Sequence, residues 1–550
     1  MFILNKPAKE FKDQIGRGSH WDKIASDAIK RKKKIKNTDL FICESGLGAS
    51  GFPHIGSFAD GARAYAVKLA VEDQGTYKSK YYAYADDLDG LRKVPAGVSD
   101  TLKEWIGVPV SNIPDLFECH ESYGKHMSSL LLDALNTANI EYVAKSAAEM
   151  YSTGVLTEQI STILDQSQKA GEIIESITGQ DKYLENVPFH PICRNCGKIY
   201  TTQVISFDTS TNSVEYECLD AEIRGNKIPG CNDRGVVDYS KGQGKLSWKV
   251  EFAARWHALQ VDFEPFGSDI HESVLVNNKI SSELFKYQPP TQLRYEMFLD
   301  KEGKKRSKSA GNVFTPQVWY KYGSPQSLVL LTLKRTEGTR SLDTTDIPKF
   351  LEELEELEEI YHGYKIIKNE KNLLQSKTLF EYCNWLKVPD THSLIINPAN
   401  NRVQRVQFSL ISKLFDFIPD NVDKFEFMKK ELYNYSMIFS ESDWDKILPK
   451  IKYAKNWIDD HEESEPVEIE LIDNERKVLK EFILKLKNIN DVDDIPTFVP
   501  DLVKANDVQI KRFFQILYLI SIGQNSGPKI TKVIQTIGIN PFIKLIKKHL

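Results

Sequence analysis

No apolar run in this sequence approaches the roughly 20 residues that a membrane-spanning helix needs, and mean hydropathy is −0.39. The opening stretch, residues 1–18, already carries a charge at Lys6 and lacks the continuous apolar core of a secretory signal. We therefore expect a cytoplasmic protein without a membrane partner. A strongly basic balance is missing too, since 72 Lys and Arg face 77 Asp and Glu, which leaves only local patches for binding phosphate.

Cysteine is scarce, with seven in 550 residues, and the odd number argues against a disulfide framework. Four of the seven fall within a short stretch: Cys193, Cys196, Cys218 and Cys231. A CxxC pair followed by two further cysteines predicts a structural Zn²⁺ site, with His190 as a competing ligand. The alternative is four reduced, partly buried thiols.

The first third of the chain has the pattern of an α/β domain. A short apolar run, Leu40–Cys43, ends in the glycine-rich stretch Glu44–Gly51, and apolar residues then recur at helical spacing over Phe58–Asp73. A second strand is predicted over Tyr81–Ala85 and ends in a pair of aspartates. Strand, loop, helix and strand in this order predict a βαβ unit.

Later segments change character. Short β-like runs alternate with the clustered cysteines over residues 188–250, which predicts an insertion, and the α/β pattern resumes near Leu293–Leu299. From about residue 345 the pattern is helical to the end. Near the start, Lys30–Lys36 carries six positive charges in seven positions, either as a solvated helix end or as an RNA contact.

Two motifs carry the chemistry. Pro53-His54-Ile55-Gly56-Ser57 stands at a predicted loop-to-helix junction, where free backbone N–H groups and the helix dipole favour phosphate. The second motif, residues 304–312, places four cations in five residues before small residues, and such lysines can neutralise a leaving pyrophosphate. Taken alone, the first motif is more simply a helix cap, and the second is more simply a solvated basic turn.

In this order along the chain, the motifs resemble the HIGH and KMSKS signatures of class I aminoacyl-tRNA synthetases. The second signature reads Lys305-Arg306-Ser307-Lys308-Ser309, and the departures at Ser57 and Arg306 leave His54, Gly56 and both lysines in place. Further blocks narrow the resemblance to the class I lysyl-tRNA synthetase family. These blocks are Ser19–Trp21, Glu44–Gly46, Asp86–Pro95, Trp248–Trp256, Val261–Pro265, Tyr295–Asp300 and Gly527–Lys529.

The resemblance implies a Rossmann-like, doubly wound α/β catalytic domain with a zinc-containing insertion, followed by an all-α anticodon-binding region. The implied domains are an N-terminal helix with the first half of the catalytic domain (1–187), the cysteine-rich insertion (188–245), the second catalytic half with the KMSKS-like loop (246–345), and the helical anticodon-binding region (346–550).

The implied activity is the ATP-dependent formation of lysyl-adenylate, with Mg²⁺ accompanying ATP, and transfer of lysine to tRNA(Lys). His54, Lys305 and Lys308 are the expected catalytic residues. The expected ATP-binding residues are Gly51, Pro53, His54, Gly56, Lys305, Ser307 and Lys308. The expected lysine-binding residues are Gly46, Trp256, Tyr295 and Asp269.

Several alternatives stay open. Gly48 stands where the family often has a hydroxyl residue, which leaves one substrate contact undefined. Asp86 and Asp87 are further acidic candidates, or a helix cap and an ion pair with Arg92. Competing functions are a synthetase for glutamate or arginine, a related nucleotidyltransferase without tRNA, and a zinc-containing RNA-binding protein without catalysis.

Overall fold

The computed structural model describes residues 16–35, 38–223, 225–299, 314–386, 405–415, 418, 422–461, 469–489, 491–522, 525–526 and 529–550. These residues form two compact units. The first contains the described residues up to 386 except 321–324 and 351–355; the second contains those two short segments and the chain from 405 onward. The domain boundaries expected from the sequence remain predictions.

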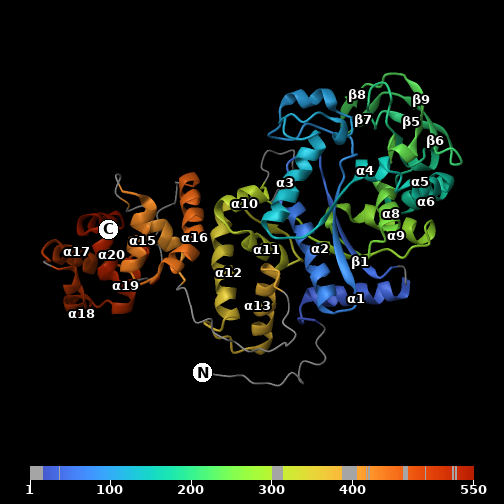
Figure 1. Cartoon of the computed structure of the whole chain (residues 1–550). Helices are drawn as coiled ribbons and strands as arrows, with labels where there is room; N and C mark the ends of the chain where they lie inside the picture. Colours follow the sequence, from blue (N-terminus) through green and yellow to red (C-terminus); the bar gives the residue numbers. More distant parts are fainter. Residues whose placement is uncertain are drawn as a thin grey trace. The chain divides into compact units, whose positions relative to one another are not determined.

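A five-stranded sheet lies at the centre of the first unit (Figure 1). It consists of β1 (Leu40–Leu47), β2 (Lys78–Ala85), β3 (Val143–Ser146), β11 (Phe263–Gly267) and β12 (Thr291–Tyr295). The order is β12-β11-β1-β2-β3 and every pairing is parallel, as predicted for a Rossmann-like domain. The order reverses between β1 and β11, whose register pairs Cys43 with Phe263.

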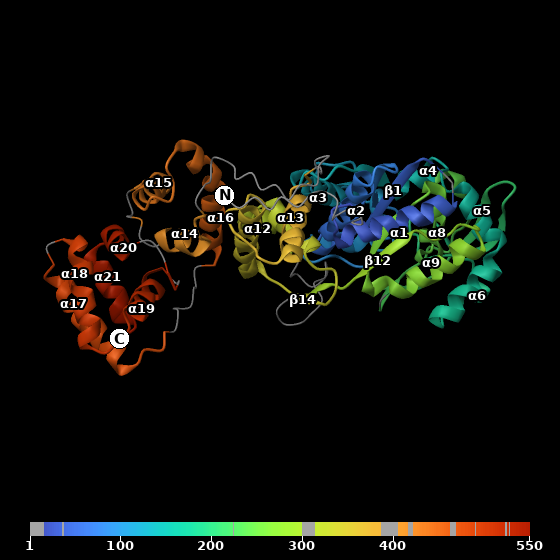
Figure 2. The same ribbon diagram turned by 90° about the horizontal axis from the view of Figure 1, so that it is seen from below.

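Helices cover both faces of this sheet, because β1 is buried along nearly its whole length and needs partners on each side. One face carries α1 (His20–Ile35), α2 (Ile55–Asp73), α3 (Tyr123–Thr137) and α11 (Pro325–Leu333). On the other, Ile42 and Tyr84 share a core with α5 (Thr157–Asp165), α6 (Ser167–Thr178), α8 (Trp248–Leu259) and α9 (His271–Glu283). Figures 1 and 2 both draw α8 and α9 side by side.

Between β3 and β11 the chain forms the insertion expected from the sequence. Its strands are β4 (Phe189–Pro191), β5 (Thr202–Asp208), β6 (Ser213–Cys218), β7 (Ala221–Ile223), β8 (Asn226–Ile228), β9 (Arg234–Asp238) and β10 (Gly244–Leu246). The β-like runs expected at Ile199–Phe207, Val214–Glu217 and Val236–Tyr239 overlap β5, β6 and β9, which form one antiparallel sheet. Strands β4 and β10 pair antiparallel at the base of the insertion.

The chain up to residue 383 contains further short elements and two longer helices. The short elements are α4 (Ala147–Ser152), α7 (Lys182–Glu185), β13 (Phe298–Leu299), α10 (Pro316–Tyr322) and β14 (Arg340–Ser341), and the longer helices are α12 (Ile347–Tyr361) and α13 (Glu370–Cys383). The 3₁₀ helices lie at Asp100–Trp105, Val110–Asn112, Tyr239–Lys241, Ser268–Ile270 and Thr344–Asp346.

The second unit is helical, as predicted. Its helices are α14 (Phe408–Phe415), α15 (Lys424–Asn434), α16 (Glu441–Asp460), α17 (Asp473–Lys487), α18 (Ile495–Ala505), α19 (Ile510–Ile522), α20 (Ile530–Ile537) and α21 (Ile539–Lys548), with a 3₁₀ turn at Val492–Asp494. Their apolar faces share one core that includes Met428, Phe482 and Phe513. Across the described parts of both units, no helix combines the length and apolarity needed to cross a bilayer.

Candidate active site

A pocket opens at the carboxyl ends of β1, β11 and β12, next to the point where the strand order reverses. Its walls include Gly48 after β1, Asp86 after β2, Gly267 at the end of β11 and Tyr295 at the end of β12. Parallel α/β sheets bind their ligands at this position, because the loops from neighbouring strands separate there.

Six of the residues expected in the site line this pocket: Gly46, His54, Gly56, Trp256, Asp269 and Tyr295. Gly51 and Pro53 are not among the lining residues. The expected phosphate-binding residues Lys305, Ser307 and Lys308 lie outside the described part of the chain. The described residues on either side of that segment do reach the site: Phe298 lines the pocket, and the Phe314 carbonyl accepts a hydrogen bond from the Ile55 N–H at 2.9 Å.

His54 caps α2. Its Nδ1 accepts a hydrogen bond from the Ser57 N–H at 3.1 Å. His54 is therefore a helix cap, the simpler of the two roles considered for this motif. In the neutral ring this bond places the proton on Nε2, which makes Nε2 a donor. Gly56 is required by this arrangement, because a Cβ there would lie 2.8 Å from the imidazole. The helix cap and the pocket wall are therefore the same side chain.

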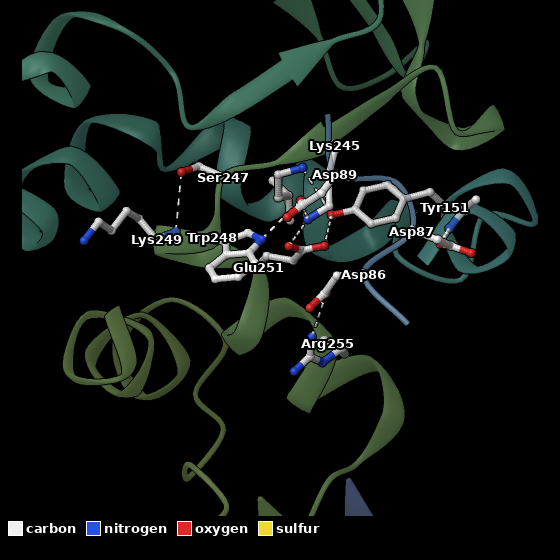
Figure 3. Close-up of polar contacts among 12 residues, drawn as sticks. Asp86, Asp87, Asp89, Tyr151, Lys245, Ser247, Trp248, Lys249, Glu251 and Arg255 are labelled. Carbon is white, nitrogen blue, oxygen red and sulfur yellow. Dashed lines mark hydrogen bonds and ion pairs between the residues drawn. The ribbon is translucent and has the colours of Figure 1, made fainter. Parts of the chain in front are cut away.

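Arg255 of α8 is buried among three carboxylates. Its guanidinium lies 2.5 Å from Glu44, 2.8 Å from Glu264 and 3.6 Å from Asp86 (Figure 3 shows the Asp86 contact). The face of β1 that packs against α8 carries Glu44, which explains how a charged residue sits inside a strand. One Glu44 oxygen and one Asp86 oxygen have no hydrogen-bond partner among the described residues.

Burial raises the pKa of two of these carboxyls, Glu44 and Asp86, and Arg255 only partly offsets the effect. The pKa of Glu44 rises to about 8 and that of Asp86 to about 7. Asp60 on α2 also lines the pocket, and burial raises its pKa to about 7 although Tyr295 donates a hydrogen bond to it. The site thus holds more acidic groups than cations to balance them.

The two aromatic residues expected in the site are anchored differently. Trp256 is almost fully buried, and its indole N–H donates to Glu264. The Tyr295 ring packs against the guanidinium of Arg63, whose carbon lies 4.1 Å from the ring centre. Each aromatic ring is therefore fixed by a charged partner.

The paired aspartates after β2 have separate roles. Asp86 faces Arg255 and the pocket, whereas Asp87 accepts hydrogen bonds from the Ala148 N–H at 2.9 Å and the Ser146 hydroxyl at 2.6 Å. Asp87 therefore holds the start of α4, although the N-cap residue of that helix is Ser146 and not Asp87. Arg92 lies nearest to neither of them: its carboxylate neighbour is Asp89, at 3.9 Å.

The four clustered cysteines come together in space, with all four sulfur atoms within 4.8 Å of one another. The Cys193–Cys231 and Cys196–Cys218 sulfurs are 3.5 and 3.7 Å apart. These separations exceed a disulfide bond and match the edge of about 3.8 Å expected for a tetrahedron with Zn–S bonds of about 2.3 Å. His190 is not part of this cluster.

A second cluster of potential metal ligands was missed from the sequence. Asp115, Cys119, His120 and His126 bring one oxygen, one sulfur and two ring nitrogens within 4.8 Å of one another. The Cys119 sulfur lies 3.1 Å from His120 Nδ1 and 3.2 Å from His126 Nδ1. The signal that could have identified it is the spacing D-x₃-C-H-x₅-H, which combines three ligand types within twelve residues.

Comparison with known proteins assigns most of the chain. Residues 19–385 match the family described as tRNA synthetases class I (K), and residues 451–550 match an anticodon binding domain. A lysine--tRNA ligase of Cenarchaeum symbiosum is 40% identical over 98% of this chain and 100% of its own length. A lysine--tRNA ligase of Rickettsia bellii is 29% identical over 95% of this chain and 96% of its own.

Among solved structures, a glutamate tRNA ligase from Elizabethkingia meningosepticum covers 92% of this chain and 99% of its own, with 10% identity and a TM-score of 0.36. A score this low carries no argument about the fold. The family match and the 40% identical relative, both extending over most of the chain, are decisive. The chain belongs to the class I (K) family of tRNA synthetases.

Proposed function

We propose that this chain is a lysine--tRNA ligase, which activates L-lysine with ATP and transfers it to the 3′ end of tRNA(Lys). The observation that carries the assignment is the 40% identity to a lysine--tRNA ligase along the full length of that relative. The chain has both the synthetase and the anticodon-binding match that the two-step reaction needs. A nucleotidyltransferase that does not act on tRNA would not need an anticodon-binding domain.

The charge of the pocket favours lysine over glutamate. Asp60, Asp86, Glu264 and Asp269 line it, and among the described lining residues the Lys or Arg side chain is Arg255. An ε-ammonium group would find carboxylate oxygens there, whereas a second carboxylate would meet repulsion. Trp256 and Tyr295 add aromatic surface that can hold an ammonium group. Asp269, predicted from the sequence, remains a candidate for binding the ε-ammonium group. Asp86 and Glu264 are further candidates, because they also line the pocket.

The ATP end of the site is assigned to the start of α2. The positive end of the dipole of this 19-residue helix favours phosphate, and His54 Nε2 can donate to a phosphate oxygen. We propose that Lys305 and Lys308 contact the same polyphosphate; this is supported by Phe298, which lines the pocket, and by Phe314, whose carbonyl bonds Ile55.

The reaction needs no protein nucleophile. A lysine carboxylate oxygen attacks the α-phosphorus of ATP, a new P–O bond forms, and the bond to pyrophosphate breaks. A ribose hydroxyl of tRNA then attacks the activated carbonyl and releases AMP. The residues of the site act by positioning both substrates and by stabilising charge on the leaving pyrophosphate, with Mg²⁺ arriving on ATP.

Amino-acid-dependent exchange between ATP and pyrophosphate tests the assignment. We expect exchange with lysine and none with glutamate or arginine, followed by charging of purified tRNA(Lys) with labelled lysine. Exchange with arginine and not with lysine would overturn the substrate, since arginine also brings a cation.

We also propose Zn²⁺ at Cys193, Cys196, Cys218 and Cys231, where the sulfur separations fit a tetrahedral site. Asp115, Cys119, His120 and His126 form a second candidate of mixed ligands. When bound, such an ion crosslinks the segments that supply its ligands. Metal analysis of the purified chain should give two ions, and Cys196→Ser and His126→Ala should each remove one.

A further inference from the structure

Lys245 is a buried cation at the base of the insertion with no part in the reaction described above. It lies on β10 and is 2% exposed. Its Nζ is 2.9 Å from Asp89 Oδ1 and also contacts the Glu251 carboxylate (Figure 3). The Tyr151 hydroxyl donates to the other Glu251 oxygen at 3.1 Å, which completes a buried polar network.

This network ends at the wall of the lysine pocket. The indole N–H of Trp248 donates to Asp89 Oδ1 at 3.2 Å, and Trp248 lines the pocket. Glu251 lies on the same helix, α8, between Trp248 and Arg255, so Lys245 contacts the part of α8 from which both residues reach the pocket. The polar residues around Lys245 therefore contact α8 at Trp248 and at Glu251.

From the same point a second chain of contacts runs through Arg92 to Tyr200, whose neighbour Thr201 accepts a hydrogen bond from the Cys218 sulfur at 3.3 Å. Arg92 lies between two aromatic rings, 5.6 Å from the Trp248 ring centre and 5.3 Å from that of Tyr200, and its Nη2 donates to the Tyr200 hydroxyl at 3.2 Å. Tyr200 follows Cys196 by four residues. It packs directly on the backbone of Gly90, where a Cβ would lie 2.6 Å from its ring.

We propose that the insertion is part of the amino-acid site: Tyr200, Arg92 and Lys245 are positioning residues that hold Trp248 and α8 against the bound lysine. The inference rests on the proposed function for the identity of the ligand. It predicts that disordering the cysteine cluster weakens the binding of lysine, even when no tRNA is present.

The first test is Arg92→Met, whose side chain keeps the apolar stem and loses the contact with Tyr200. We expect the Kd for lysine, measured by calorimetry on the full chain without ATP or tRNA, to rise about threefold to tenfold. The KM for ATP should stay within about twofold. Tyr200→Phe should give a smaller change in the same direction.

Tyr239→Phe is the matched control, because this insertion tyrosine also loses one hydroxyl contact, to Ser161 at 2.7 Å, and is not in the network. It should leave the Kd for lysine unchanged. An equal loss in Tyr239→Phe and Tyr200→Phe would overturn the proposal in favour of general damage to the insertion.

The second test removes metal from the full chain with a chelator and follows hydrogen exchange in α8. We expect faster exchange over residues 249–255 and weaker lysine binding, with a smaller further loss in Arg92→Met than in the wild-type chain. If hydrogen exchange in α8 is unchanged and only the charging of tRNA is reduced, the proposed coupling between the cysteine cluster and α8 is wrong. If the untreated chain binds no lysine, the proposed function fails instead. Hydrogen exchange in α8 still tests whether the cysteine cluster is coupled to that helix.

Discussion

At the scale of single residues, His54 combines a structural and a chemical task, and the two can be separated. Its Nδ1 caps α2 through the Ser57 N–H, while Nε2 carries the proton that a phosphate oxygen would accept. Asparagine is also a good helix cap, but cannot place a donor where Nε2 lies. His54→Asn should therefore keep the fold and lose the chemistry.

We expect His54→Asn to lower lysine-dependent exchange between ATP and pyrophosphate by about 10² to 10³, the usual cost of losing a donor to developing charge. His54→Ala should lose the same activity and a further 1 kcal/mol or so of stability, because it also loses the cap. Affinity for tRNA should be nearly unchanged in both. Equal losses of exchange and tRNA affinity would point to misfolding.

The acidic groups around Arg255 predict a pH dependence of lysine binding. Burial raises the pKa of Asp86 to about 7 and of Glu44 to about 8, so the folded chain favours their protonated forms. Their contribution to stability is present at low pH and is lost as the pH rises through these values. Bound lysine favours the charged carboxylates instead.

The KM for lysine should therefore fall about threefold to tenfold between about pH 6 and about pH 8, whereas the KM for ATP should change little. Asp86→Asn keeps the shape of the side chain and should flatten this profile. A wild-type KM for lysine that rises with pH would contradict the assignment of these carboxyls to the lysine site.

The sequence predicted His54 and Trp256, which both line the pocket, and left open those residues whose role depends on neighbours. Asp86 and Asp87 are adjacent and chemically identical, yet one faces the pocket and the other holds α4. Arg255, which organises the acidic groups, lies 211 positions from Glu44. Only the folded chain shows that they meet.

At the scale of elements, the basic run at the end of α1 is neither a fully solvated helix end nor a uniform RNA surface. Arg31 and Lys32 turn inward and pair with the buried Asp262 at 3.1 and 2.7 Å, whereas Lys33 is exposed. The described cations of the run therefore divide by burial: Arg31 and Lys32 fix α1 to the chain just before β11, whereas Lys30, Lys33 and Lys34 are exposed.

Lys32→Met should cost up to about 3 kcal/mol of stability in denaturant unfolding, because it leaves a buried carboxylate with Arg31 as its remaining cation. Lys33→Met, on the exposed side of the same turn, should cost about 0.5 kcal/mol or less. Similar effects of the two substitutions would contradict the inward pairing.

The length of β1 shows what local pattern can and cannot predict. The apolar run predicted a strand over Leu40–Cys43, but the strand continues to Leu47 because Glu44, Ser45 and Gly46 pair with β2. Ser45 bonds the Tyr81 hydroxyl on one face and Glu44 meets Arg255 on the other. Polar residues end a strand in sequence patterns, but not where distant partners satisfy them.

At the scale of the whole molecule, the pocket residues all belong to the first compact unit, and the anticodon-binding match falls within the second. The two half-reactions should therefore be separable. A chain ending after residue 386 should retain lysine-dependent exchange between ATP and pyrophosphate and lose the charging of tRNA(Lys).

The measurement is exchange and charging on the shortened and full chains, with circular dichroism as the check on folding. A folded short chain that exchanges no pyrophosphate would show that adenylate formation depends on the helical unit. A short chain that charges tRNA at the full rate would remove the role proposed for that unit.

The central strand has a consequence for how the protein is made. The neighbour of β1 on one side, β2, follows shortly after it, but Cys43 and its partner Phe263 on the other side are separated by more than two hundred positions. While the ribosome is still synthesising the insertion, the backbone groups along that side of β1 have no strand to pair with. The growing polypeptide must therefore protect an open sheet edge for much of its synthesis, and it cannot form adenylate until β11 and β12 have emerged.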